Sequence, residues 1–222
     1  MNVENFVLYE SIYKEQENAL DRSSSYRDFI ERRRSLRFFS DKDVSQETIE
    51  NIIMAASSAP SGAHKQPWTF CAISSAALKT KIRAAAEEEE YKSYNGRMSE
   101  DWLADLQKFD TDWNKPFIEI APWIIVLFKK AFDYSPEGKK LKNYYVNESV
   151  GIAAGFFISA VHHAGLVTLT HTPSPMNFLQ ELLDRPDNER PYLLLPVGYP
   201  AEDAVVPVLK RKHKEEVIVF YK

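Results

Sequence analysis

The sequence predicts one α/β or α+β domain that is built on a single central sheet. Helical patterns alternate along the chain with short apolar runs that have the length of strands. No linker, repeat or low-complexity segment divides the 222 residues, and hydrophobic residues make up 44% of them, enough for a substantial core. A single domain over residues 1–222 is therefore expected.

The N-terminal part of the chain is expected to be helical. Residues 3–33 mix charges with apolar side chains at the spacing of a surface helix: Phe6, Tyr9, Ile12, Tyr13 and Leu20. A second helix follows Ser45, a preferred N-cap residue, and carries a buried stripe of Ile49, Ile52, Ile53 and Ala56. It ends at the helix breaker Pro60–Ser61–Gly62.

The remaining chain alternates between the two kinds of element. Apolar runs predict strands at residues 69–74, 123–128, 166–170 and 192–197. Composition and apolar spacing predict helices at residues 76–91, 147–164 and 178–183. Helix 147–164 is apolar nearly all round and contains Gly151 and Gly155, which indicates that another backbone packs closely; a monomer core and a subunit interface both fit.

Composition excludes several classes of function. A net charge of −4 argues against a general nucleic-acid binder, and one cysteine, Cys71, allows no internal disulfide. The longest uncharged apolar run, residues 150–161, is shorter than the about 20 residues that span a bilayer, and no signal peptide is recognisable. The histidine spacing predicts no zinc site, and no Rossmann or P-loop motif is present. A cytoplasmic protein with no metal is expected.

Four stretches carry groups suited to chemistry. Arginines surround Ser35 and suit a phosphate or carboxylate, although a solvated helix end fits too. The proline-bounded loop 59–68 lets a backbone approach a ligand at Gly62, or is a structural turn. Thr170–Pro173 follows a predicted strand, where α/β proteins bind ligands, or caps a helix. A basic triplet at residues 210–212 is taken in isolation as solvated surface.

The segment EEEEYKSY, residues 87–94, is typical of a solvated helix face. Glu90 and Tyr94 nevertheless lie four residues apart, on one face of a helix. Glu87, Glu88 and Glu89 are interpreted as solvated surface.

Together these stretches resemble the nitroreductase family of FMN enzymes. Its R-x-S-x-R/K motif corresponds to Arg33, Ser35 and Arg37, and its basic residue near the C-terminus to Arg211. The similarity is greatest to the iodotyrosine deiodinases of this family and extends from about Arg32 to the C-terminus. It rests on segments in the same order and spacing: RRSLRFF, SAPSGAHKQPWTF, EEEEYKSY, APWIIVLF, LVTLTHTP, LLLPVGYP and VPVLKRK. Vertebrate members carry an N-terminal membrane anchor, and this chain is expected to be a soluble bacterial homologue.

The resemblance implies a nitroreductase-like α+β fold (α/β-type, three-layer) in which helices flank a central mixed β-sheet. It also implies the residues of an FMN site. These are Arg33, Arg34, Ser35, Arg37, Pro60, Ser61, Gly62, Thr170, Thr172 and Arg211. Thr172 would offer its hydroxyl to flavin N5, and the Ala63 N–H would bind the substrate phenolate; these two are the implied catalytic residues. His171, before Thr172, and Pro116, after Lys115, depart from the family pattern and could shift specificity.

The resemblance also implies the substrate site and the reaction. Glu90, Tyr94 and Lys115 would bind the amino-acid end of a halotyrosine. Residues 87–115 are expected to form a mobile lid that excludes water. The expected reaction is reductive dehalogenation by stepwise one-electron transfer from reduced FMN, in an intertwined homodimer supplied by NAD(P)H or an unknown reductase.

Two alternatives remain. A general NAD(P)H-dependent nitroreductase or quinone reductase would share the FMN residues but would not need Glu90, Tyr94 and Lys115 as a zwitterion clamp. A protein that senses an aromatic amino acid would bind the ligand and release no halide.

Overall fold

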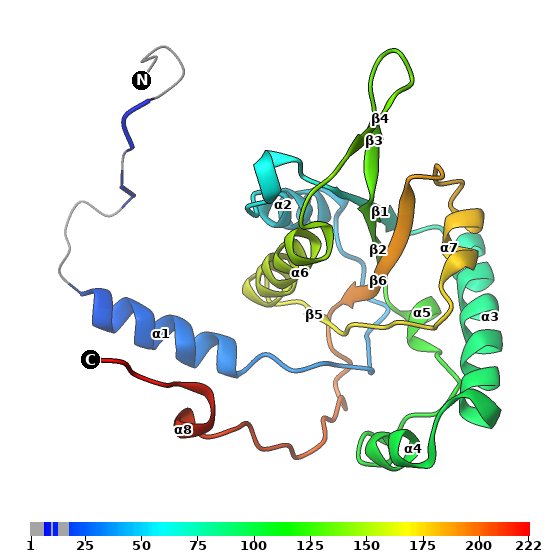
Figure 1. The fold of residues 1–222 in the computed structure, drawn as a ribbon. Coiled ribbons are helices and arrows are strands. Elements are labelled where there is room, and N and C mark those ends of the chain that lie inside the picture. Colours follow the sequence, from blue (N-terminus) through cyan, green and yellow to red (C-terminus); the bar gives the residue numbers. More distant parts are fainter. Residues whose placement is uncertain (1–6, 10, 13–17) are drawn as a thin grey trace. The chain divides into compact units, whose positions relative to one another are not determined.

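A computed structural model of the chain describes residues 7–9, 11–12 and 18–222. The chain forms two compact units, Met1–Arg33 and Arg34–Lys222, which are described separately. Helix α1, Ala19–Glu31, follows Asn18, whose φ of 76° is left-handed, and none of its residues is buried (Figure 1). The predicted helix over residues 3–33 is therefore confirmed only from Ala19 onward.

The first half of that prediction is wrong where it can be compared. Tyr9 and Ile12 lie outside any helix, and Phe6 and Tyr13 lie outside the described residues. The apolar spacing was misleading because it predicts a helix face that packs on a core, whereas the side chains of Tyr9, Ile12 and Leu20 are all largely exposed.

The second unit is built on a four-stranded sheet. Its strands follow the order β1 (Trp68–Ile73), β2 (Trp123–Lys130), β6 (Glu189–Gly198) and β5 (Val167–Thr168). All three strand pairs are antiparallel. The expectation of a mixed sheet is met only at its edge, where Ser35 and Thr168 form a parallel bridge. An apolar run shows that a strand is buried but carries no information about its direction.

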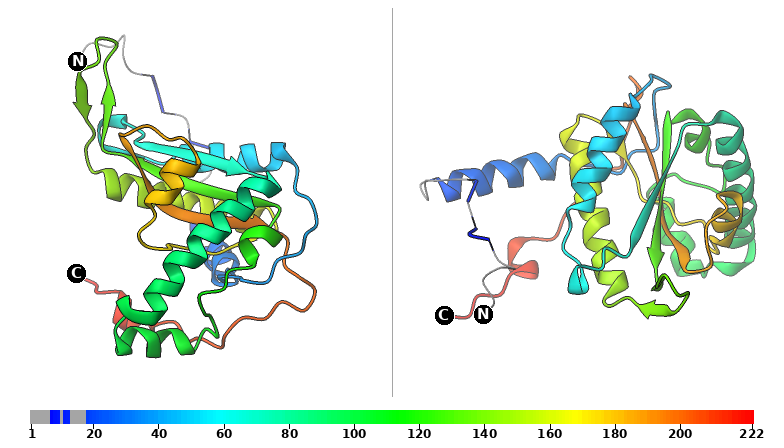
Figure 2. Two further views of the ribbon diagram at one scale, coloured as in Figure 1. Left: turned by 90° about the vertical axis from the view of Figure 1, so that its right-hand side faces the viewer. Right: turned by 90° about the horizontal axis from the view of Figure 1, so that it is seen from above.

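Helices cover both faces of this sheet, which gives the three predicted layers (Figures 1 and 2). Helices α2 (Gln46–Ser57) and α6 (Val146–His163) pack on one face. Helices α3 (Ala76–Lys92), α5 (Phe117–Ile120) and α7 (Asn177–Leu182) pack on the other. The central strand β2 has six consecutive buried residues, as expected of a strand covered on both sides.

Local signals place the helices. Ser45 Oγ accepts the Thr48 N–H at 3.2 Å, so the predicted N-cap of α2 is confirmed, and the helix buries Ile49, Ile52 and Ala56. The other predicted helices and strands agree with the structure within about two or three residues, β5 being the shortest. The helices and strands that were not predicted are the hairpin β3 (Phe132–Tyr134) and β4 (Lys140–Lys142), and the helices α4 (Glu100–Gln107), α5 (Phe117–Ile120) and α8 (Lys214–Val217).

The two glycines of α6 do not meet another backbone within the described chain. A Cβ added at Gly155 would meet no atom within 4 Å, and one at Gly151 would meet only the Tyr192 hydroxyl, at 3.4 Å. The monomer core thus does not explain them. No helix within residues 18–222 is long and apolar enough to cross a bilayer.

Candidate active site

Three residues predicted from separate parts of the sequence converge on one side of the sheet. Glu90 and Lys115 are both buried, at 8% and 4% exposure, with Lys115 Nζ 3.6 Å from Glu90 Oε2. Tyr94 lies one helical turn after Glu90, and Lys115 Nζ is 5.4 Å from its ring centroid. We call Glu90, Tyr94 and Lys115 the clamp. The structure confirms that these three predicted residues come together.

The fold brings the clamp together by turning the chain back on itself. Helix α3 continues into a π-helical turn, Ser93–Arg97, and the chain returns past Thr111 to Lys115. Tyr94 Oη donates to the Thr111 carbonyl at 3.2 Å, and Lys115 Nζ donates to Thr111 Oγ1 at 3.3 Å and to the Asp112 carbonyl. The returning loop thus positions both side chains.

Burial sets the electrostatics of the clamp. It raises the pKa of Glu90 and lowers the pKa of Lys115, and the opposite charge of each partner works against the shift of the other. Burial also raises the pKa of Tyr94, with the nearby Glu90 carboxylate as the next cause. The clamp therefore offers one carboxylate, one ammonium group and one neutral phenol in a weakly hydrated place.

A cavity of about 190 Å³ opens beside the clamp. Arg37 and the segment Thr170–Thr172 also line it, together with apolar side chains that include Trp102 and Phe117. Helix α4 contributes the cover on one side. The cavity thus joins the predicted substrate residues to three of the predicted cofactor residues, Arg37, Thr170 and Thr172.

The segment after β5 alternates between exposed and buried residues. Thr170 and Thr172 are exposed, whereas His171 between them is buried and pairs with Leu194 of β6 through two backbone hydrogen bonds of 2.9 and 3.0 Å. The His171 ring meets Phe117 edge-on, with centroids 5.6 Å apart. Burial, with Lys115 and Arg37 nearby, lowers the pKa of His171 to about 3. Its Nε2 has no hydrogen-bond partner among the described residues.

The predicted basic residues are only partly assembled. Burial lowers the pKa of Arg37, which lies over the Phe109 ring at 5.6 Å, and Arg34 donates to the Pro207 carbonyl. Next to Ser35, the Leu36 N–H donates to the Thr168 carbonyl at 3.2 Å, which fixes the segment on the edge of the sheet. Ser35 and Arg37 line a second cavity of about 320 Å³, bounded by residues 108–117 and 205–207.

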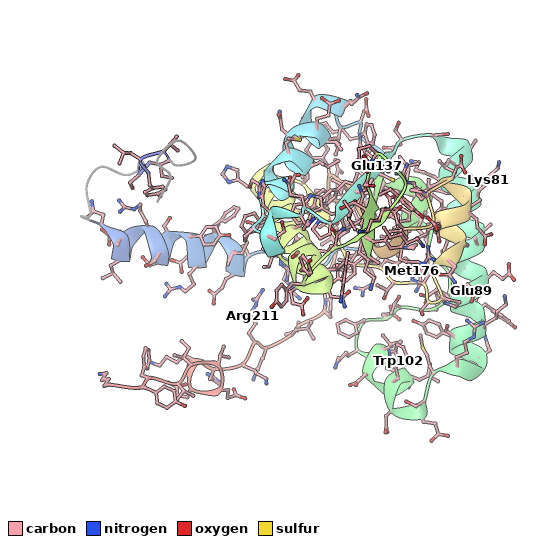
Figure 3. All side chains as sticks on the ribbon, turned by 45° about the horizontal axis from the view of Figure 1, so that its top comes forward. Lys81, Glu89, Trp102, Glu137, Met176 and Arg211 are labelled. Carbon is pink, nitrogen blue, oxygen red and sulfur yellow. The ribbon has the colours of Figure 1, made fainter. Side chains whose placement is uncertain are left out.

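The other two predicted arginines are described separately. Arg33 belongs to the first unit. Arg211 lies on the C-terminal segment, apart from Glu89 on α3 and Trp102 on α4 (Figure 3), and lines neither cavity.

The loop that contains Pro60, Ser61, Gly62 and Ala63 also lines neither cavity. Its backbone is unusual, because Ala63, His64 and Gln66 have positive φ angles of 48°, 54° and 47°. Each such residue costs about 1 to 2 kcal/mol and persists where the surroundings fix it. Within one chain, the structure does not bring Ala63 to the clamp.

The solvated interpretation of the glutamate run is wrong for two of its members. Glu87 accepts the Lys115 N–H at 2.7 Å and the Arg83 guanidinium at 2.7 Å. Glu89 pairs with Arg97 at 2.6 Å. Only Glu88 is a solvated side chain, with 68% exposure. The i,i+4 spacing of Arg83 and Glu87 is visible in the sequence. The contact of Glu87 with Lys115 depends on the chain return, and that of Glu89 with Arg97 on the π-helical turn, and neither follows from local helical spacing.

A match to a protein-family model establishes the family to which this chain belongs. The Nitroreductase family model matches residues 30–199. This chain belongs to the nitroreductase family. The nitroreductase fold accounts for the order of the four strands and for the two helical layers. Among the described residues, no three His, Cys, Asp or Glu side chains gather as a metal ion would require.

Individual relatives show to which members of the nitroreductase family this chain is similar. The chain is 61% identical over 216 residues to a protein of Haliscomenobacter hydrossis named iodotyrosine deiodinase, covering 97% of each chain. It is 42% identical over 219 residues to the human protein named iodotyrosine deiodinase 1, covering 98% of this chain and 75% of that protein.

A solved structure agrees with them. It is oxidised iodotyrosine deiodinase bound to FMN and 3-iodo-L-tyrosine, with a TM-score of 0.73 and 29% identity over 88% of this chain and 98% of that one. A BluB-like flavoprotein from Clostridium difficile 630, with a TM-score of 0.68 and 22% identity, shares the fold.

Proposed function

We propose that this protein is an FMN-dependent reductive dehalogenase that converts iodotyrosine into tyrosine and iodide. The observation that carries the proposal is the clamp, where a buried carboxylate and a buried ammonium group lie 3.6 Å apart beside a cavity. The relatives named iodotyrosine deiodinase support the same substrate class.

The charges of the clamp complement those of an amino acid. The substrate ammonium group pairs with Glu90, and its carboxylate pairs with Lys115 and accepts a hydrogen bond from Tyr94. Without substrate, Glu90 and Lys115 compensate each other's charge. A zwitterionic ligand replaces the single Glu90–Lys115 contact with two ion pairs, one to each residue. A ligand with both charges is therefore favoured over a ligand with a single charge. A general nitroreductase has no need of this arrangement.

The residues of this chain suit FMN. Arg34 and Arg37 are guanidinium groups near the strand edge, and such groups bind phosphate. Thr170 and Thr172 present exposed hydroxyls beside the cavity, and Thr172 would donate to the flavin ring nitrogen N5 of a bound FMN. Arg33 and Arg211 complete the phosphate site in this proposal.

The reaction replaces a carbon–halogen bond with a carbon–hydrogen bond. It consumes two electrons and one proton and releases halide. FMN, when bound in its reduced form, supplies the two electrons one at a time. The clamp orients the ring, the Ala63 N–H stabilises the phenolate, and closure of residues 87–115 excludes water.

A homodimer completes the site. The loop with Ala63 does not reach the clamp cavity of its own chain. We infer that a second copy supplies Pro60, Ser61, Gly62 and Ala63, and that the two chains are intertwined. The electrons come from NAD(P)H or from a separate reductase, and a cytoplasmic location remains a prediction.

Iodide release tests the proposal directly. The purified protein should be yellow with bound FMN, and after anaerobic reduction it should release one iodide for each reduced FMN when iodotyrosine is added. Colourless protein that takes up no FMN contradicts the whole proposal. Efficient turnover of nitroaromatics without halotyrosine binding favours a general reductase. Tight iodotyrosine binding without iodide favours an amino-acid sensor.

A further inference from the structure

In the loop Ser61–Gln66, which we call the amide loop, some backbone N–H groups donate hydrogen bonds within the chain and others do not. Gly62 N–H donates to Ser149 Oγ at 3.3 Å, and His64 N–H to the Ser61 carbonyl at 3.0 Å. Lys65 N–H donates to the Gly62 carbonyl at 3.1 Å, and Gln66 N–H to Ser61 Oγ at 2.9 Å. Ala63, between them, is exposed, and no hydrogen bond of its N–H is found among the described residues. Among residues 62–66, the Ala63 N–H is thus the donor left for a ligand.

That donor is held in a conformation that alanine seldom adopts. Ala63 and His64 have φ angles of 48° and 54°, and Gln66 repeats the left-handed conformation at 47°. At its first end, the loop is pressed against the start of α6, because a Cβ on Gly62 would lie 2.9 Å from the Tyr144 carbonyl. At its other end, the Gln66 carbonyl accepts the Trp68 N–H at 2.8 Å. Both ends are therefore anchored.

Between these anchors, one side-chain contact ties the left-handed residues together. Gln66 Nε2 lies 3.0 Å from His64 Nε2. An amide nitrogen can only donate, so the imidazole nitrogen accepts and His64 carries its proton on Nδ1. His64 and Gln66 belong to neither the predicted FMN residues nor the clamp. They are the part of the motif APSGAHKQPW that the proposed function leaves unexplained.

We propose that His64 and Gln66 are positioning residues that fix the Ala63 N–H and thereby select ionised, ortho-halogenated phenols over neutral ones. The inference rests on the proposed function, in which the Ala63 N–H binds the phenolate. A hydrogen bond to a charged oxygen is about twice as strong as one to a neutral oxygen, and the gain depends on a fixed donor. An N–H donor that is not fixed in position loses most of this difference in strength between hydrogen bonds to charged and to neutral oxygen atoms. The contact between His64 and Gln66 therefore controls how steeply the affinity for a ligand rises as its phenol becomes more acidic.

The test compares this slope between variants. The FMN-loaded, oxidised protein is titrated with tyrosine and with ring-fluorinated, chlorinated and iodinated tyrosines at one pH, with flavin fluorescence as the signal. For Gln66→Ala we expect about tenfold weaker binding of the most acidic phenols, little change for tyrosine and unchanged FMN affinity. A merely structural role would weaken all ligands alike.

Two further variants keep the test decisive. Gln66→Gly also deletes the side-chain contact but adopts a positive φ without strain, so it should flatten the slope while the loop still folds. Lys65→Ala is the matched control, because Lys65 has ordinary right-handed geometry in the same loop, and its slope should equal that of the unmodified protein.

The outcomes separate the two proposals. Unchanged slopes in both Gln66 variants overturn the positioning role. If the unmodified protein itself shows no dependence on phenol acidity, the phenolate contact of the proposed function is wrong instead.

Discussion

At the scale of single residues, the clamp depends on a charge pair that is expensive to bury. Two ions lose hydration on burial, and their mutual attraction offsets this loss only in good geometry. The 3.6 Å separation of Lys115 Nζ and Glu90 Oε2 is longer than a strong hydrogen bond. Such a pair is a poor source of stability and a good receptor, because a zwitterion inserted between the two charges gives both a closer partner.

Glu90→Gln tests this role. The variant keeps the shape of the side chain but removes the partner of the substrate ammonium group. We expect halotyrosine affinity to fall by about 2 kcal/mol, or roughly 30-fold, from loss of a charge-assisted hydrogen bond. FMN should remain bound, and flavin fluorescence titration measures both. Loss of FMN instead would show that Glu90 belongs to the cofactor site.

His171 should make stability depend on pH. Its pKa is about 3 in the folded protein and ordinarily 6.5, so between these values the unfolded chain binds the additional proton. Stability is therefore complete above pH 6.5 and is lost as the pH falls toward 3. From pH 7 to pH 5 this one group removes about 2 kcal/mol. His171→Gln should lessen the pH dependence of urea unfolding by about this amount; an unchanged dependence would mean that the ring is not buried as a neutral group.

At the scale of elements, the segment over the cavity is weakly held by packing. Helix α4 buries no residue, and Trp102 lines the cavity while remaining largely exposed. Arg97 ties the preceding turn to Glu89 at 2.6 Å and to the Ser174 carbonyl at 3.4 Å. Few buried contacts allow local opening at low cost. A bound ligand that touches α3 and α4 together should close the segment.

Limited proteolysis checks whether residues 87–115 act as a lid. Cutting in this segment should slow several-fold when iodotyrosine is added to the FMN-bound protein, because the ligand bridges the clamp and the cavity wall. The Glu90→Gln variant at the same ligand concentration is the control and should remain sensitive. If cutting of the unmodified protein is the same with and without iodotyrosine, the segment is not a lid.

The elements also show where sequence patterns stop being informative. Strand β2 and helix α2 follow from apolar runs and a cap, which are local properties. Glu90 and Tyr94 follow from helical spacing together with the family resemblance. The contacts of Glu87 and Glu89, by contrast, involve Lys115, which a chain return brings close, and Arg97, which the π-helical turn places beside Glu89. His171 was noticed only as a departure from the family pattern, because burial of a polar side chain is a property of the tertiary structure.

At the scale of the whole molecule, one chain does not assemble the complete proposed site. The clamp, Arg37 and Thr172 surround one cavity, whereas Ala63 lies on a loop outside it. Helix α6 also presents apolar side chains at its surface, because Ile152 and Phe156 are 42% and 44% exposed. A second copy that covers α6 and brings its own amide loop would account for both observations.

Gly155→Ala distinguishes the free chain from the dimer. In the isolated chain a methyl group at Gly155 meets no atom within 4 Å, so alanine should stabilise the helix by about 0.5 to 1 kcal/mol. In a dimer that packs closely on α6, the same methyl group occupies the interface. We expect weaker association in sedimentation experiments, with loss of bound FMN at dilutions where the unmodified protein retains it. If alanine instead raises the melting temperature equally at all protein concentrations, α6 does not face a second copy, and the amide loop must reach the clamp in another way.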